Sequence, residues 1–151
     1  MRIFVVLLGI TIAAASAPEE KGKSLQLSSL PAAVQKTIQD NLKGADIKSI
    51  GKEKEDGVEQ YEVETRLNGK SRDFNVDIKG NLLVVEEAST IDAVPAAAKA
   101  AILKKVADGK ITSIETVTKP GQASMYEAGY TAKNGKKHEF LVKADGTEVK
   151  D

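Results

Sequence analysis

Two stretches of the chain, residues 27–87 and 90–151, carry nearly the same pattern of residues twice. In each stretch a proline followed by two alanines comes first, and apolar residues, aromatic residues and glycines then recur in the same order. Because each copy must form the same supersecondary unit, such a duplication restricts the fold to two similar parts. The matched pairs include Pro31 and Pro95, Ile38 and Ile102, Ile47 and Ile111, Tyr61 and Tyr126, Asn68 and Asn134, Phe74 and Phe140, and Gly80 and Gly146.

The period of the apolar residues predicts a helix at the start of each copy and strands in the rest. Apolar residues such as Val34 and Ile38 are four apart, which gives one apolar stripe on a helix. Farther on, apolar and charged residues alternate on both sides of the Asn-Gly pair at 68–69, which is typical of a two-residue hairpin turn. This turn predicts a register in which Val63 lies opposite Phe74.

The second hairpin needs a longer turn, and two further strands frame each hairpin. An extra residue before Gly135 predicts a three-residue loop, which keeps Ala128 opposite Phe140. The stretch 82–85 is apolar on both faces and predicts a covered strand near the junction of the copies, whereas the charged stretch 147–151 predicts an exposed edge strand. We therefore expect an α+β tandem repeat, in which each copy is a helix followed by a four-stranded antiparallel meander sheet.

The first residues have the layout of a secretory signal peptide. Arg2 gives a positive start, an apolar stretch follows, and small residues close it, so residues 1–17 are the predicted leader. The apolar stretch is shorter than the roughly 20 residues that span a bilayer stably. Cleavage after Ala17 fits an A-x-A site but leaves a proline at the new terminus, and cleavage after Ala15 is the alternative. We expect a periplasmic or secreted protein whose residues 18–26 form a flexible segment.

Charge and cysteine content exclude several classes of partner and site. The chain has 22 Lys and Arg against 22 Asp and Glu, so it lacks the positive charge that nucleic acids and anionic membranes attract. It has no cysteine, which excludes disulfides and thiol chemistry. We expect a monomer without a stable membrane span, a cofactor or a nucleic-acid partner.

The motifs of both copies resemble the PepSY-like domain, whose fold is that of the β-lactamase inhibitory proteins. They are a Leu-Pro-Ala-Ala stretch near the helix start at 30–33, Tyr-x-Val at 61–63, Asn-Gly-Lys at 68–70, Phe-x-Val at 74–76 and the closing turn at 77–80. The resemblance covers almost the whole mature chain. It implies an exported, non-catalytic module, with peptidase inhibition or protein binding proposed for some relatives. No functional residue of the family maps onto this sequence.

The sequence contains few side chains that could form a catalytic or metal-binding site. His138 is the only histidine, and it lies beside Lys136 and Lys137 without the partners that a metal site or a catalytic dyad requires. Its counterpart in the first copy is Arg72. The residues therefore favour a protein that is not an enzyme.

The charged residues of the two hairpins define the candidate partner-binding face. In the predicted register Glu64 lies directly opposite Asp73, a like-charge pair that is destabilising unless something neutralises it. Three interpretations stay open for these residues: a solvated face, a docking surface for an extracytoplasmic protein or peptide, and a weak Ca²⁺ site on the acidic hairpin within a metal-responsive or envelope-structural protein. The candidate residues are Glu62, Glu64, Arg66, Asp73, Asp77, Lys133, Lys137, Glu139 and Lys143.

Overall fold

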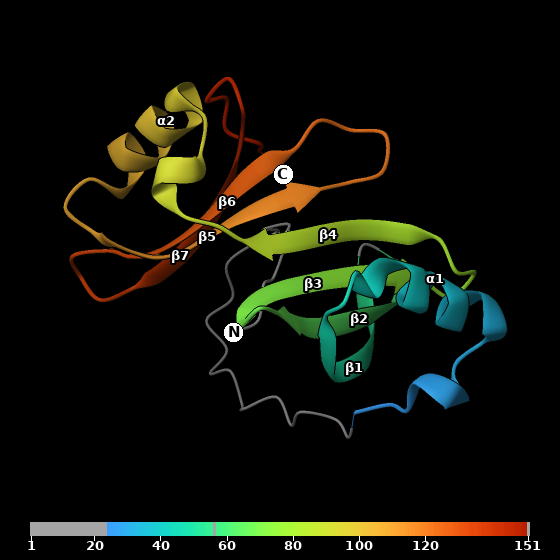
Figure 1. Ribbon diagram of the computed structural model, residues 1–151. Helices are drawn as coiled ribbons and strands as arrows, with labels where there is room; N and C mark the ends of the chain where they lie inside the picture. Colours follow the sequence, from blue (N-terminus) through green and yellow to red (C-terminus); the bar gives the residue numbers. More distant parts are fainter. Residues whose placement is uncertain (1–23, 56, 151) are drawn as a thin grey trace.

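A single antiparallel sheet dominates the structure, a computed structural model that describes residues 24–55 and 57–150 (Figure 1). Seven strands in this part of the chain lie in the sheet in the order in which they occur along the chain. They are β1 (Asp46–Glu55), β2 (Val58–Leu67), β3 (Lys70–Asp77), β4 (Leu82–Ala88), β5 (Lys110–Thr118), β6 (Met125–Thr131) and β7 (Lys137–Lys143).

Two helices pack on the same face of this sheet, one near each end (Figure 1). They are α1 (Ala32–Leu42) and α2 (Ala96–Val106), and each follows a short 3-10 turn, η1 (Leu27–Ser29) or η2 (Ile91–Ala93). Each helix begins directly after a proline, a residue that the first turn of a helix tolerates because its missing N–H is not needed there. The predicted helices are therefore confirmed.

Each helix covers its own apolar cluster on the sheet. Val34 and Ile38 of α1 pack with Ile50, Val63 and Phe74 from β1–β3, and all five side chains are almost fully buried. The second cluster is likewise built from residues of a helix and the sheet, here Val94, α2 and β5–β7. Its buried members are Val94, Ala98, Ile102, Val106, Ile114, Ala128, Phe140 and Val142.

The expected division into two helix-plus-four-strand units is wrong, because the sheet is continuous. Strand β4 pairs with β5 from Val85 opposite Thr118 to Ala88 opposite Glu115, so the apolar stretch that was expected near a junction is paired on both edges. This pairing removes two free strand edges, which would otherwise attract other chains. After β7, the charged stretch 147–150 makes an isolated bridge between Glu148 and Val142, so the described residues of the second matched stretch contain no fourth strand.

Both predicted hairpin registers are confirmed. Val63 lies opposite Phe74 in the first hairpin, and Ala128 lies opposite Phe140 in the second. In the second hairpin Gly135 has a φ of 81°, the left-handed conformation that the longer turn required.

The predicted leader, residues 1–17, lies outside the described residues, as does most of the predicted flexible segment 18–26. Across residues 24–55 and 57–150, we find no helix with the length and apolar character needed to cross a membrane.

Two glycine turns bring the sheet into direct contact with the helices. Gly80, in the turn between β3 and β4, has a φ of 93°, and a Cβ atom at this position would lie 2.8 Å from the Cβ of Ala33 on α1. Gly146, in the turn after β7, has a φ of 85°, and its Cβ would lie 2.7 Å from the carbonyl oxygen of Ala97 on α2. Backbone conformation and close packing therefore both require glycine at these turns.

We expect Gly80→Ala to lower the free energy of unfolding by about 2–4 kcal/mol, because it adds a steric clash to the strain of the left-handed conformation. Gly57→Ala is the matched control: its φ is 80°, but nothing lies within 4 Å of the added Cβ, so the expected loss is about 1 kcal/mol. Urea unfolding of the two variants measures the difference. Equal losses would show that the contact between the turn and the helix contributes nothing.

Candidate functional site

Acidic side chains gather on the face of the sheet opposite the helices, which we call the distal face. Successive side chains of a strand point to opposite faces, so the buried apolar residues under the helices leave the alternate positions on the distal face. There Asp73 on β3 lies directly opposite Glu86 on β4, and Glu115 on β5 lies directly opposite Glu127 on β6. Together with Glu139 on β7, these residues form what we call the acidic strip.

The strip is continuous across five neighbouring strands. Glu86 lies opposite Val117, two residues from Glu115, so these two glutamates are diagonal neighbours. Glu127 and Glu139 are diagonal neighbours in the same way, since Glu139 lies opposite Gly129. Direct cross-strand neighbours have Cβ atoms about 5 Å apart and diagonal ones about 7–8 Å apart. Each carboxylate in the strip is therefore within reach of the next.

Burial and mutual repulsion make Glu86, Glu115 and Glu127 hold protons near neutral pH. Burial raises the pKa of Glu86 to about 8, with further contributions from Glu127, Glu115 and Asp73. Burial likewise raises the pKa of Glu115 to about 7 and that of Glu127 to about 8, and neighbouring carboxylates add to both shifts. The pKa of Glu139 is also raised by burial. The buried glutamates of the strip therefore favour their neutral form more than exposed glutamates do.

One carboxylate oxygen of the strip has no hydrogen-bond donor. Glu115 is 3% exposed, and its Oε2 atom is buried without a hydrogen-bond partner among the residues described. A buried polar atom left in this state costs about 1–3 kcal/mol. The arrangement is suited to a donor that comes from outside the chain.

Asp73, at the other end of the strip, is satisfied within its own hairpin. Its carboxylate accepts hydrogen bonds from the backbone N–H of Thr65 and from Ser71 Oγ, both at 2.7 Å, and Arg66 Nη1 lies 3.8 Å away. Asp73 was predicted to face solvent but is 8% exposed. The expected repulsion with Glu64 is relieved because Asp73 binds the backbone, and Arg66 gives the partial compensation that the sequence suggested.

The other predicted acidic residues of the first hairpin have local partners as well. Asp77 accepts hydrogen bonds from the Asn81 side chain and from the N–H groups of Lys79 and Asn81, all at 2.8 Å, which closes the turn after β3. Glu64 accepts a hydrogen bond from Ser49 Oγ. Glu62 is half-buried opposite Asn75, on the distal face. Asp77 thus stabilises the turn between β3 and β4, and Glu64 links β2 to β1.

The predicted basic residues separate into two groups. Lys137 and Lys143 are exposed on the distal side of β7, on either side of Glu139. Lys133 instead lies in the turn after β6, with its Nζ 3.8 Å from Asp108 Oδ2, and both side chains are 84% exposed. The structure therefore brings Lys137, Glu139 and Lys143 together beside the acidic strip and places Lys133 near the end of α2.

Sequence reasoning missed Glu86 and Glu115, which lie near the centre of the strip. Glu115 alternates with Ile114 and Thr116 in a clear strand pattern, so its face could have been predicted. Its alignment with Glu86 depends on the pairing of β4 with β5, which joins the two matched stretches and cannot be predicted from residues close in the sequence.

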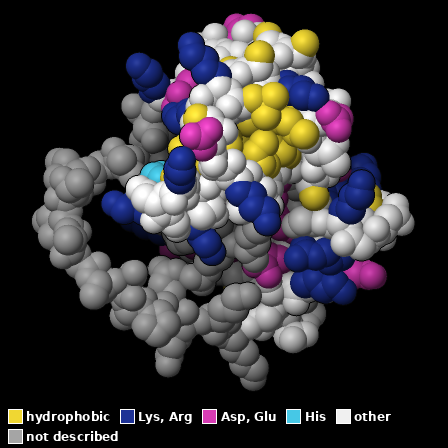
Figure 2. Space-filling model, turned by 90° about the vertical axis from the view of Figure 1, so that its left-hand side faces the viewer, with side chains coloured by type: hydrophobic (Ala, Val, Ile, Leu, Met, Phe, Trp, Pro, Cys, Tyr) yellow, Lys and Arg dark blue, Asp and Glu magenta, His cyan; other side chains and the backbone are white. Residues whose placement is uncertain are grey.

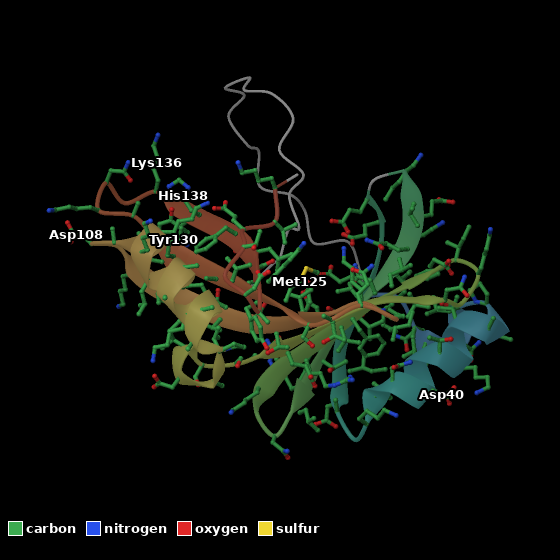
Figure 3. The ribbon with its side chains drawn as sticks, turned by 90° about the horizontal axis from the view of Figure 1, so that it is seen from above. Asp40, Asp108, Met125, Tyr130, Lys136 and His138 are labelled. Carbon is green, nitrogen blue, oxygen red and sulfur yellow. The ribbon has the colours of Figure 1, made fainter. Side chains whose placement is uncertain are left out.

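His138 lies at the far end of the sheet and takes no part in the strip. Its ring stacks on Tyr130 with the ring centroids 5.1 Å apart (Figure 3). Within the described ranges 24–55 and 57–150, no group of three or more His, Cys, Asp or Glu side chains is arranged to hold a metal ion. His138 therefore acts as an exposed strand residue in contact with an aromatic ring.

A hydrophobic surface occurs on the helix side of the molecule. Figure 2 shows hydrophobic side chains gathered on the end that carries α2, where Leu103 is 47% exposed. The surrounding helix is rich in alanine. This hydrophobic surface on the helix side is the alternative to the distal face as a docking surface.

Comparison with known proteins identifies the fold. No protein-family model matches the chain, and no curated protein sequence matches it. Among solved structures, a BLIP-like protein from Bacteroides fragilis is similar over 80% of this chain and 83% of its own, with 18% identity and a TM-score of 0.59. A DUF2874 family protein from Bacteroides ovatus has 16% identity, coverage of 81% and 86%, and a TM-score of 0.64. A "putative periplasmic" protein from Bacteroides eggerthii has 18% identity, coverage of 80% and 86%, and a TM-score of 0.66.

The fold is therefore that of the BLIP-like proteins, as the resemblance implied. The narrower assignment to the PepSY-like domain stays a prediction, because no family model matches. The solved structures share less than a quarter of their residues with this chain, so the likeness shows the fold alone.

We expect the Tm of the protein to fall by at least about 5 °C between pH 5 and pH 8. The pKa values of Glu86 and Glu127 are about 8 in the folded state against an ordinary 4.5, so the folded chain binds more protons than the unfolded chain in this range. The stabilisation is complete below pH 4.5 and is lost as the pH rises through 8. Thermal melts of the wild type and of Glu86→Gln/Glu127→Gln measure the effect.

The double variant should show a much flatter dependence of Tm on pH, because glutamine does not titrate. Asp40→Asn, on the exposed side of α1, is the matched control and should keep the slope of the wild type. A slope that is the same in all three proteins would mean that the strip does not hold protons.

Proposed function

We propose that this chain is an exported, non-catalytic binding module that docks a protein or peptide on the distal face of its sheet. The single observation that carries the proposal is the acidic strip, which places buried carboxyl groups side by side across five strands although their ionisation destabilises the sheet. Residues kept at the expense of stability commonly belong to a functional surface. Lys137, Glu139 and Lys143 extend this surface to the exposed edge strand β7.

Export is supported by the predicted leader and by the periplasmic description of a protein with the same fold. Under this proposal the mature chain starts after Ala15 or Ala17, continues through a flexible segment to residue 26, and then contains the two matched stretches 27–87 and 90–151. The protein acts as a monomer in the periplasm or outside the cell. The proposal includes an inhibitory role, in which the bound protein would lose its activity. The similarity of the fold to that of a BLIP-like protein supports this part of the proposal.

The alternative, a metal-responsive or envelope-structural protein with a Ca²⁺ site on the acidic hairpin, has less support. Asp73 and Asp77 use their oxygens for hydrogen bonds within the hairpin, and Glu64 accepts one from Ser49. Calcium takes six to eight oxygen ligands. Carboxylates that already bind backbone and hydroxyl groups are poorly placed to supply them.

Exchange of the two charges at Lys137 and Glu139 tests the docking face. Both side chains are exposed on β7, and Lys137→Glu/Glu139→Lys leaves the net charge and the fold unchanged while reversing the local charge pattern. We expect this variant to capture the partner about tenfold less efficiently from the native extracytoplasmic fraction, a loss of the order of 1.4 kcal/mol. Affinity capture with quantitative mass spectrometry measures it.

Leu103→Asp, on the hydrophobic surface of α2, is the comparison variant and should capture as much as the wild type. If capture depended on Leu103 and not on the residues of β7, the helix side would be the docking surface and the proposal would be wrong.

A further inference from the structure

We infer that the acidic strip is a receptor for a lysine or arginine side chain, presented by a peptide segment in which basic and apolar residues alternate. This inference rests on the proposed function and deepens it, because it names the chemistry of the partner. The receptor consists of Glu115, Glu127 and Glu139, with Glu86 beside them.

The buried oxygen of Glu115 points to a ligand that donates hydrogen bonds. Glu115 Oε2 lacks a donor among the residues described, and the residue directly opposite is another carboxylate, Glu127. A group from another protein that satisfies both glutamates in their ionised form carries several N–H donors and a positive charge, which describes a lysine ammonium or an arginine guanidinium. Such a cation would also remove the repulsion between the two glutamates.

Glu139 is the exposed residue of the strip that a basic side chain would contact first. Glu139 is exposed on the edge strand, and its charge acts on both Glu115 and Glu127. A long basic side chain can therefore be attracted first by Glu139, and its contact with Glu127 and Glu115, which are 6% and 3% exposed, then requires a local movement of the strip. This order suits a flexible side chain several carbons long.

Apolar neighbours favour a peptide over a free ion. Leu141 lies opposite Glu127, and Val117 lies opposite both Glu86 and Met125 in the adjoining strands. Met125 is half-buried near the middle of the molecule, between the two ends of the sheet (Figure 3). The aliphatic stem of lysine or arginine and an adjacent apolar residue of the partner can pack on Leu141 and Met125, which are both half-buried, whereas a metal ion cannot use them.

The spacing of the carboxylates also argues against a metal ion. Neighbours in the strip are about 5 Å and 7–8 Å apart at Cβ, and the described side chains do not converge on a common point. An extended peptide advances about 3.3 Å per residue, so basic residues two positions apart are separated by nearly 7 Å. This matches the diagonal step from Glu127 to Glu139.

The test is direct binding of a short fluorescent peptide that alternates lysine and leucine, measured by fluorescence anisotropy with the purified, processed protein. We expect binding by the wild type and at least tenfold weaker binding by Glu115→Gln/Glu127→Gln. Asp40→Asn/Asp92→Asn removes the same number of charges from the helix side and should bind as the wild type does. A peptide with glutamate in place of lysine should not bind.

Folding is checked in the same proteins. Glu115→Gln/Glu127→Gln removes repulsion, so its Tm should equal or exceed that of the wild type. Glu139→Gln changes an exposed residue and should weaken peptide binding about threefold without altering Tm. Loss of binding in these variants therefore reports the receptor and not unfolding.

Three results would overturn the inference: no binding of the lysine–leucine peptide, equal loss in the helix-side control, or complete displacement of the peptide by millimolar CaCl₂ together with a rise in Tm caused by calcium alone. If the peptide failed but exchange of Lys137 and Glu139 still abolished capture, the proposed function would stand and only the basic partner would be wrong. If the exchange left capture unchanged, the proposed function itself would fall.

Discussion

The pairing of β4 with β5 is the interaction on which the rest of the structure depends. It joins two matched halves into one sheet, and its register, from Val85 opposite Thr118 to Ala88 opposite Glu115, decides which residues become neighbours across the junction. A shift of one residue would move Glu115 of β5 to the helix face, where the apolar clusters would have to bury it. The observed register keeps Ile114 under α2 and Glu115 on the distal face. Core packing therefore fixes the position of the acidic strip.

The arrangement of the helices explains why the distal face carries polar side chains. Both helices cover the same side of the sheet, and each fills its own apolar cluster with residues from three strands. The two clusters account for nearly all the large buried apolar side chains, so the opposite face is not needed for the core. A sheet of this kind can carry polar side chains on its second face, and here these side chains are mainly carboxylates.

The sequence predicted local structure well and long-range pairing poorly. Periodicity and turn chemistry were sufficient to predict both helices, the two hairpin registers and the left-handed conformation of Gly135. Each of these features depends on residues that are close together in the chain. The join between β4 and β5 could not be predicted, since nothing in either strand specifies its partner. For the same reason Glu86 and Glu115 were missed. Asp73 was predicted to be a surface charge, because alternation gives the face of a residue but not the hydrogen bonds that bury it.

The carboxylates at one matched position have different hydrogen-bond partners in the two halves of the chain. This difference indicates which of them has a structural role. In the sequence match Asp73 corresponds to Glu139, and Glu64 corresponds to Gly129. In the first half the carboxylate binds the backbone of Thr65 and the hydroxyl of Ser71, and it stabilises the hairpin. In the second half the described residues donate no hydrogen bond to Glu139, which stands beside Glu127 and Glu115 instead. A purely structural role would favour the first arrangement in both halves, so the second is better explained by a positive charge that arrives from another molecule.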